Sequence, residues 1–169
     1  ILLREEVYRA TQGKIDFFQT PKFVRIARYG KKIQMNEGVC PAYSDCRMGL
    51  SPDKFILSYC DRALGITSAE EQPVLPKGNN LSLHLLELFT SRVAKVGMTD
   101  GIRQVLQEES DALRAYYEQA GILIARPVGG TSCRLAISAK GGTNAENHNH
   151  NDVGSYAVAL GSETMVGDQ

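Results

Sequence analysis

Two short runs decide the fold: RLAIS at residues 134–138 and SYAVAL at residues 155–160. Polar and apolar residues alternate in both, which is the pattern of a β-strand with one buried face. The run GILIA at residues 121–125 is apolar and opens with glycine, and glycine pairs at 129–130 and 141–142 are typical of turns. The sequence therefore predicts antiparallel strands in this part of the chain.

The first 111 residues have the periodicity of helices instead. Ser51-Pro52-Asp53 is typical of a helix start, with Ser51 as the N-cap and Pro52 at the first helical position. The pattern is clearest over residues 81–96. Together, the predicted segments are helices over residues 1–8, 21–29, 55–63 and 81–96, a loop over residues 66–80, and a further helix that Thr99-Asp100 caps.

Helices followed by strands indicate an α+β fold with two domains. We expect a helical segment over residues 1–111 and a strand segment over residues 112–169. The chain has 19 basic and 19 acidic residues, and this balance argues against the general polyanion-binding surface of nucleic-acid-binding proteins. No apolar run approaches the roughly 18 residues of a membrane-spanning helix. We therefore expect neither nucleic acid nor a membrane as a partner.

The connection between the two alternating runs contains ENHNHNDVGS at residues 146–155, with two of the three histidines of the chain. If this run is extended, His148 and His150 point to the same face, because strand side chains alternate. Two imidazoles on one face can share a metal ion, or one can bind the metal while the other transfers protons. Asp168 follows an apolar run downstream, so His150 and Asp168 can form two corners of a tetrahedral zinc site. The run can also be a polar loop without chemistry, since Asn and Asp favour turns.

The segment KGGTNAENHNHNDVGSY at residues 140–156, followed by Gly167-Asp168, resembles the start of the heparinase II/III-like domain of bacterial polysaccharide lyases. The run YEQAGILIAR at residues 117–126 is similar to the strands that enter the same domain. The resemblance extends from about Tyr116 to the end of the chain and is looser at residues 8–13 and 43–46. Members of this family are several times longer, so we expect this chain to be a fragment of a longer protein.

This resemblance implies a fold and an activity. The implied fold is the end of an α/α toroid-like helical domain followed by the first strands of an antiparallel β-sandwich domain. The implied activity is that of a polysaccharide lyase, which cleaves uronic-acid-containing glycans by β-elimination. The expected partners are an acidic polysaccharide or oligosaccharide substrate and the rest of the full-length chain, and the expected location is periplasmic or secreted.

The resemblance also implies which residues form the site. His148 is expected to be catalytic. His150 and Asp168 are expected to bind a structural zinc ion whose third ligand lies outside this chain. The residues expected to contact the substrate are Asn147, Asn149 and Lys140. Asp152 is expected to orient a neighbouring imidazole, as carboxylates near metal sites do.

Other functions remain open. The main alternative is a non-catalytic carbohydrate-binding or scaffold module of the same fold, because neither Tyr8 nor Tyr29 has surroundings that match the family's catalytic tyrosine. A metal-dependent hydrolase with a His-His-Asp site is a third possibility. The four cysteines form no CxxC pair, so we expect free thiols that behave as small buried apolar groups, rather than disulfides or a zinc cluster.

Three further groups have a structural and a functional interpretation. His84 lies in a mostly apolar predicted helix, where a structural role is expected. Asp45 lies in a predicted loop, where it can serve a turn or contact the substrate. The basic residues Arg25, Arg28 and Lys31-Lys32 form either a solvated helix surface or a contact for an acidic glycan.

Overall fold

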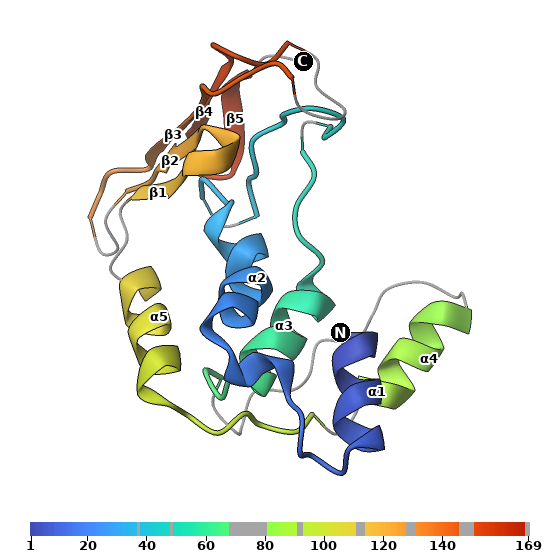
Figure 1. Ribbon diagram of the computed structural model, residues 1–169. Helices are drawn as coiled ribbons and strands as arrows, with labels where there is room; N and C mark the ends of the chain where they lie inside the picture. Colours follow the sequence, from blue (N-terminus) through green and yellow to red (C-terminus); the bar gives the residue numbers. More distant parts are fainter. Residues whose placement is uncertain are drawn as a thin grey trace. The chain divides into compact units, whose positions relative to one another are not determined.

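The computed structural model describes residues 1–36, 38–47, 49–67, 81–90, 93–110, 114–127, 131–145 and 151–167. Within these residues the fold is α+β, with five α-helices and one five-stranded antiparallel sheet (Figure 1). This confirms the predicted switch from helices to antiparallel strands. No helix in the described part of the chain is both long and apolar enough to span a membrane.

The chain forms two compact units, each built from two stretches of sequence. The helical unit comprises residues 1–29 and 53–110, and the sheet unit comprises residues 30–52 and 111–169. The sequence pattern predicts one boundary, at residue 111, which places residues 30–52 with the helices. The structure assigns this segment to the sheet unit because Met35 and Val39 are buried in its core. The side-chain amide of Asn36 also donates to the carbonyl of Gly161 at 2.9 Å.

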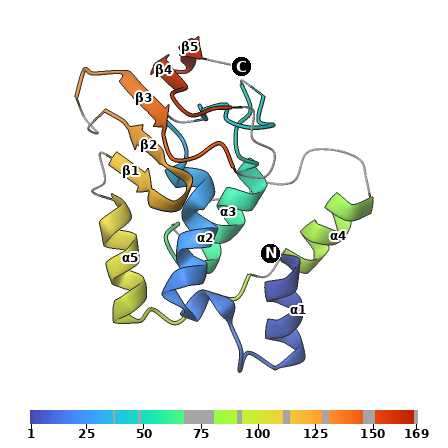
Figure 2. The ribbon, with the colours of Figure 1, turned by 45° about the horizontal axis from the view of Figure 1, so that its top comes forward.

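The helical unit is built around an apolar core to which helices and a short segment without regular secondary structure all contribute. Figure 2 shows α2 and α3 side by side, and an ion pair between Arg28 and Asp61 joins them at 2.5 Å. The core residues are Phe18, Val24, Tyr59, Cys60, Ala63, Leu64, Val96, Ile102 and Val105. The elements are α1 (Leu2–Ala10), the 3-10 helix η1 (Phe17–Gln19), α2 (Pro21–Lys32), α3 (Lys54–Ala63), α4 (Leu81–Thr90) and α5 (Asp100–Ser110).

Two predicted helix boundaries were wrong. The N-cap of α3 is Asp53 and not Ser51, since the Asp53 carboxylate accepts hydrogen bonds from the backbone of Phe55 and Ile56. The helix predicted over residues 81–96 ends at Thr90. Val96 instead lies in a segment without regular secondary structure and donates its backbone N–H to the carbonyl of Ala63 at 2.8 Å. By contrast, the predicted start of α5 is confirmed, because the Thr99 hydroxyl accepts the N–H of Ile102 at 3.3 Å.

A buried charged network lies beside the core of the helical unit. The Arg4 guanidinium makes two hydrogen bonds to the Asp16 carboxylate, at 2.8 and 2.6 Å, and a third to the Tyr59 hydroxyl at 2.8 Å. Tyr59 in turn donates to the Glu5 carboxylate at 2.5 Å. All four side chains are buried. Burial alone lowers the pKa of Arg4, but the bonds to Asp16 and Tyr59 outweigh it, so the pKa of Arg4 is raised.

The sheet runs in sequence order, each strand antiparallel to the next (Figure 2). Its central register aligns Ala115, Ile124, Ser138 and Ala157 across four strands. The predicted strands at residues 121–125, 134–138 and 155–160 are confirmed within one or two residues. The strands are β1 (Arg114–Tyr117), β2 (Ile122–Ala125), β3 (Leu135–Lys140), β4 (Tyr156–Leu160) and β5 (Glu163–Gly167), with the 3-10 helix η2 (Glu118–Ala120) before β2.

The two faces of the sheet differ in the size of their side chains. The buried face consists mainly of small residues, including Ala136, Ser138, Ala157 and Ala159, and it packs with Met35 and Val39 of the segment 30–52. The opposite face carries large apolar residues that are exposed within the described part of the chain. They are Tyr116, Leu123, Leu135, Ile137, Tyr156, Leu160 and Val166. We call this set the outer sheet face.

Candidate functional site

The histidine motif belongs to the connection between β3 and β4, which are adjacent antiparallel strands. β3 ends at Lys140 and β4 begins at Tyr156. The structure describes residues 141–145 and 151–155 of this connection. The residues predicted to do the chemistry, Asn147, His148, Asn149 and His150, lie outside the described residues, as does Asp168. The described part of the candidate site therefore consists of the residues that hold the two ends of this connection.

The two ends of the connection are joined at its base. The backbone N–H of Lys140 donates to the carbonyl of Ser155 at 2.9 Å, and the N–H of Gly154 donates to the carbonyl of Lys140 at 2.8 Å. Further out, the side-chain oxygen of Asn144 accepts the N–H of Val153 at 3.1 Å. We call this set of bonds the neck. Its consequence is that the described ends of the connection are held together by hydrogen bonds.

Asp152 ties the loop to a distant part of the chain. One of its carboxylate oxygens, Oδ2, accepts the backbone N–H of Ser44 at 2.7 Å and the Ser44 hydroxyl at 3.4 Å. Ser44 has φ of 54° and Asn151, next to His150, has φ of 63°. Residues other than Gly rarely adopt this left-handed backbone conformation, and Asn is among those that adopt it most readily. Two such residues beside one contact indicate that the tertiary structure imposes the local backbone.

Tyr43 fixes the same segment to the sheet. Its hydroxyl donates to the hydroxyl of Ser138 at 2.9 Å, and Ser138 is fully buried on β3. Burial raises the pKa of Tyr43; the hydrogen bond to Ser138 lowers it and the charge of Asp152 raises it further. The phenol is therefore protonated at neutral pH, as its hydrogen bond to Ser138 requires.

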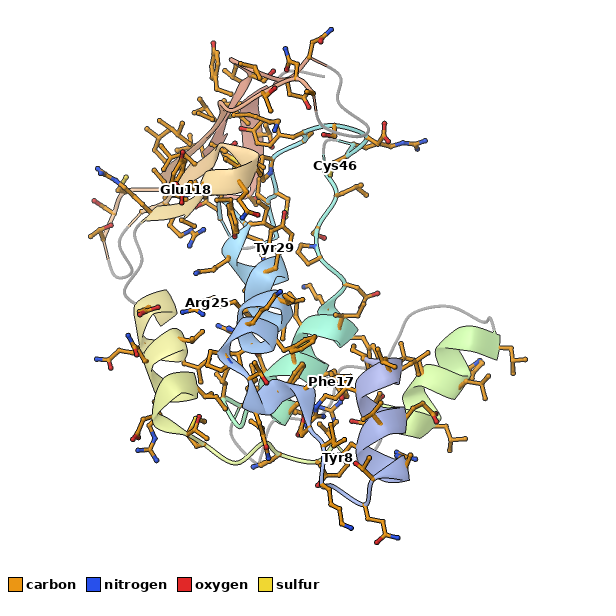
Figure 3. All side chains as sticks on the ribbon, viewed as in Figure 1. Tyr8, Phe17, Arg25, Tyr29, Cys46 and Glu118 are labelled. Atoms are coloured by element: carbon orange, nitrogen blue, oxygen red, sulfur yellow. The ribbon has the colours of Figure 1, made fainter. Side chains whose placement is uncertain are left out.

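Lys140 occupies a structural position. Its side chain is only 3% exposed, and its ammonium donates to the carbonyl of Ala120 at 3.0 Å. Ala120 ends η2, whose first residue, Glu118, is labelled in Figure 3. A buried Lys almost always has a partner, and this one joins the end of β3 to the turn that precedes β2. The predicted substrate contact requires an ammonium at the surface, and the structure has it inside the sheet unit.

The predicted zinc ligands His150 and Asp168 lie outside the described residues, but the strands next to them are described. Ala157, near the start of β4, pairs with Gly167, at the end of β5. His150 precedes β4 in the sequence and Asp168 follows Gly167 directly. Because the strands are antiparallel, the start of β4 and the end of β5 lie at the same end of the sheet. Imidazole nitrogen and carboxylate oxygen are also typical zinc ligands, so the donor types fit the metal.

No group of three or more His, Cys, Asp or Glu side chains is arranged to hold a metal ion among the described residues. The four cysteines, all described, are free thiols. Only Cys60 is buried, whereas Cys46, labelled in Figure 3, and Cys133 are exposed. The expectation that they behave as small buried apolar groups therefore fits Cys60 alone.

The remaining candidates take ordinary positions. His84 is exposed on α4, and Asp45 is exposed in the segment before α3. Two of the four basic residues singled out in the sequence have acidic partners, since Arg28 pairs with Asp61 at 2.5 Å and Arg25 pairs with Glu108 at 3.7 Å. Arg25 is labelled on α2 in Figure 3. These ion pairs reduce the net positive charge of the predicted patch.

Ser44 and Tyr43 are the site residues whose roles the sequence did not indicate. Ser44 lies 108 residues from Asp152, and Tyr43 lies 95 residues from Ser138. Neither pairing has a local sequence signal. Comparison with known proteins adds no family assignment, because no protein-family model and no curated protein sequence matches this chain.

Proposed function

We propose that this chain is part of a heparinase II/III-like polysaccharide lyase that cleaves uronic-acid-containing glycans by β-elimination. The observation that carries the proposal is the His-x-His run in the β3–β4 connection, whose ends are closed by the neck and whose Asp152 is anchored on Ser44. A loop that carries reactive side chains on a rigid scaffold is a common arrangement for catalytic groups.

The proposed reaction needs a base and a stabilised intermediate. The base removes the proton from the sugar carbon next to the carboxylate, and the electron pair of that C–H bond forms a C=C bond. The C–O bond to the leaving sugar breaks, and the leaving oxygen takes up a proton. Because the C–H group is a weak acid, hydrogen-bond donors must stabilise the negative charge that develops on the substrate carboxylate.

We assign the proton transfer to His148 and the substrate contacts to Asn147 and Asn149. His150 and Asp168 would hold the structural zinc ion, which supplies a fixed point between the loop and the end of β5. The third ligand would come from the rest of the full-length chain. Lys140 is not part of this assignment, because its buried ammonium is bound to the carbonyl of Ala120.

The proposed fold places the sheet in a β-sandwich next to the end of an α/α toroid. The support is the outer sheet face, which carries large exposed apolar side chains across the sheet, such as Tyr116 on β1, 65% exposed, and Tyr156 on β4, 54% exposed. Small residues fill the opposite face. Large apolar residues on such a face are typical of a sheet that packs on a second layer. A periplasmic or secreted location is part of the same proposal.

The first prediction separates the two histidines. In the full-length protein, His148→Ala should abolish most turnover of a uronic-acid glycan without lowering the melting temperature. His150→Ala should lower the melting temperature, because it removes a ligand whose binding free energy stabilises the fold. The measurements are the ultraviolet absorbance of the unsaturated product, the zinc content and the thermal denaturation curve of each variant.

His84→Ala is the matched control, since this exposed histidine lies on α4 of the helical unit. It should keep both turnover and melting temperature. Wild-type turnover in His148→Ala would disprove the catalytic assignment. If both His148→Ala and His150→Ala lose zinc and melt early, the two histidines are joint metal ligands and the division of roles is wrong.

The alternative is a carbohydrate-binding or scaffold module with the same fold. It differs from the lyase in one measurable respect: the protein would bind an acidic oligosaccharide in a calorimetric titration, yet form no unsaturated product from it. Loss of oligosaccharide binding in His148→Ala, with no turnover in the parent protein, would favour this alternative.

A further inference from the structure

The connection between α2 and α3 carries two thiols, Cys40 and Cys46, on either side of the residues that attach it to the sheet. Between them lie Tyr43, whose hydroxyl donates to a buried serine of β3 at 2.9 Å, and Ser44, whose N–H donates to the Asp152 carboxylate at 2.7 Å. A covalent bond between the two sulfurs would therefore enclose both attachment points in one short ring.

The chain reverses its direction between the two thiols. The N–H of Cys46 donates to the carbonyl of Tyr43 at 3.1 Å, and Ser44, inside this turn, has φ of 54°. The ends of such a turn lie within about 7 Å of each other. Cys46 therefore lies close to Tyr43 and not at the far end of an extended segment.

The surroundings of the two thiols differ, and the charge of one acts on the other. Cys40 is half-buried, whereas Cys46 is exposed (Figure 3). Burial raises the pKa of Cys40 to about 11, and the charge of Cys46 adds to this rise. Charges more than about 10 Å apart are largely screened by salt. The two sulfurs are therefore neighbours in space, and both are reduced in the structure.

We propose that Cys40 and Cys46 are a redox-sensitive pair that forms a reversible disulfide across the turn at Tyr43 and Ser44. The disulfide would hold the turn in the conformation in which both residues bond to the sheet unit. Reduction would leave the turn to its hydrogen bonds alone. The inference is independent of the lyase assignment, because it involves none of the residues proposed for catalysis or zinc binding.

The oxidant is a small-molecule disulfide such as oxidised glutathione. The exposed Cys46 thiolate attacks one of its sulfurs, the S–S bond breaks, and one glutathione thiolate leaves. The Cys40 thiolate then attacks the Cys46 sulfur of this mixed disulfide and releases the second glutathione thiolate. Each protein thiol gives up a proton and each released thiolate takes one up, so two electrons pass from the protein to glutathione.

The experiment measures the equilibrium between the two thiols and the disulfide. Full-length Cys133→Ser protein, which lacks the other exposed thiol, is incubated with mixtures of reduced and oxidised glutathione, quenched with acid and mapped by mass spectrometry. The wild-type protein is mapped in parallel. The peptide that contains both cysteines should lose two hydrogen atoms and carry no glutathione.

The same equilibrium in urea gives the reference without a fold. If the fold holds the two thiols together, the equilibrium constant for disulfide formation should be at least about tenfold larger in the folded protein. By linkage, the disulfide then stabilises the folded state by the same factor. Hydrogen exchange of the Ser44 N–H should be slower in the oxidised protein, because the turn opens less often.

Three variants serve as controls. Cys46→Ser should form no internal disulfide at Cys40. Tyr43→Phe keeps the ring but loses the hydroxyl that fixes the turn on β3, so it should bring the folded equilibrium constant closer to the value in urea. Leu50→Ala changes an exposed side chain of the same connection outside the turn and should leave the constant unchanged.

The proposal is overturned if the equilibrium constant in the folded protein equals or falls below the value in urea, since the fold would then hold the sulfurs apart. It is also overturned if Cys46 yields only a mixed disulfide with glutathione. Faster exchange of the Ser44 N–H after oxidation would show that the disulfide distorts the turn, and would equally overturn it. None of these readouts requires a glycan, so their outcome does not depend on whether the protein is a lyase.

Discussion

Cys40 shows how burial changes the chemistry of one side chain. Its thiol is half-buried in the segment that leads to Tyr43 and Ser44. Burial, with a smaller contribution from the nearby Cys46, raises the pKa of Cys40 from its ordinary value of 9.0 to about 11. The thiolate is the reactive form of cysteine, so this shift makes Cys40 a poor nucleophile at neutral pH.

We predict slow alkylation of Cys40 in the folded protein. A rise of two pKa units lowers the thiolate population at pH 8 about a hundredfold, so labelling by iodoacetamide should be slower than in the unfolded chain by up to about that factor. Mass spectrometry of labelled peptides over time measures the rate, with the exposed Cys133 as the internal standard. Equal rates for Cys40 in folded and denatured protein would contradict the prediction.

The same shift has a defined effect on stability. Because the folded-state pKa of Cys40 lies above the unfolded value of 9.0, the thiol contributes its full stabilisation below pH 9. That contribution is lost as the pH rises from about 9 to about 11. The titration of Cys40 therefore makes the folded protein less stable as the pH rises through this range.

At the residue scale, the sequence indicated which side chains are chemically unusual. It did not indicate which of them contact one another in the folded protein. The composition of residues 146–155 singles out two histidines without any structural knowledge. The tie between Asp152 and Ser44 requires two segments 108 residues apart to come together, and hydrogen-bond partners at that separation leave no periodic signal. Lys140 illustrates the opposite error, since a lysine beside a Gly-Gly turn suggests exposure while its ammonium is buried.

Among the elements, the junction of β2 and β3 depends on a close approach of two backbone segments. Gly121 precedes β2 and has φ of 61°. Its backbone lies beside Gly141, which follows β3, and the N–H of Gly141 donates to the carbonyl of Gly121 at 2.8 Å. A Cβ at position 121 would lie 2.6 Å from the backbone of Gly141 and Gly142. Only glycine fits this position without moving the backbone.

Gly121→Ala should therefore destabilise the protein by about 2–4 kcal/mol, the sum of a left-handed backbone cost and a steric clash. Gly38→Ala is the matched control, because Gly38 also has positive φ, 76°, but a Cβ there meets nothing within 4 Å of the described structure. It should cost only about 1 kcal/mol. Urea denaturation of both variants gives the comparison, and equal free energies of unfolding would show that the close approach has no steric consequence.

Element types were predictable where the periodicity was strong. The alternating runs became β3 and β4, and the helices at residues 21–29 and 55–63 became α2 and α3. Boundaries failed where two residues had the same local preference: Ser51 and Asp53 can each cap a helix, and in the structure the Asp53 carboxylate accepts the backbone N–H groups of Phe55 and Ile56. The helical pattern up to residue 96 includes the β-branched Val93 and Val96, which lie beyond the end of α4 and pack against the core of the helical unit.

For the molecule as a whole, stability depends on a buried ion network as well as on the two apolar cores. Removal of one partner from a buried pair is costly because the other charge remains desolvated. In Asp16→Ala the guanidinium of Arg4 loses its bidentate partner. We predict a loss of about 3–5 kcal/mol in the free energy of unfolding.

The comparison variant is Glu108→Ala, which removes an ion pair with Arg25 at 3.7 Å. Both side chains of that pair are about half exposed, so the loss should be less than about 0.5 kcal/mol. Thermal and urea denaturation of the two variants measure the difference. Similar losses in both would indicate that the Arg4 network contributes no more than a surface ion pair.

The composition of the sheet unit from residues 30–52 and 111–169 has a consequence for biosynthesis. A ribosome releases residues 30–52 long before the strands exist, so Met35 and Val39 have no core to enter and the partner of Asn36, Gly161, is still 125 residues away. During that interval the nascent segment exposes apolar side chains to solvent and to other chains. Residues 53–110 of the helical unit are made next, before the strands that complete the sheet unit. We expect residues 30–52 to be the part of the nascent chain that chaperones bind.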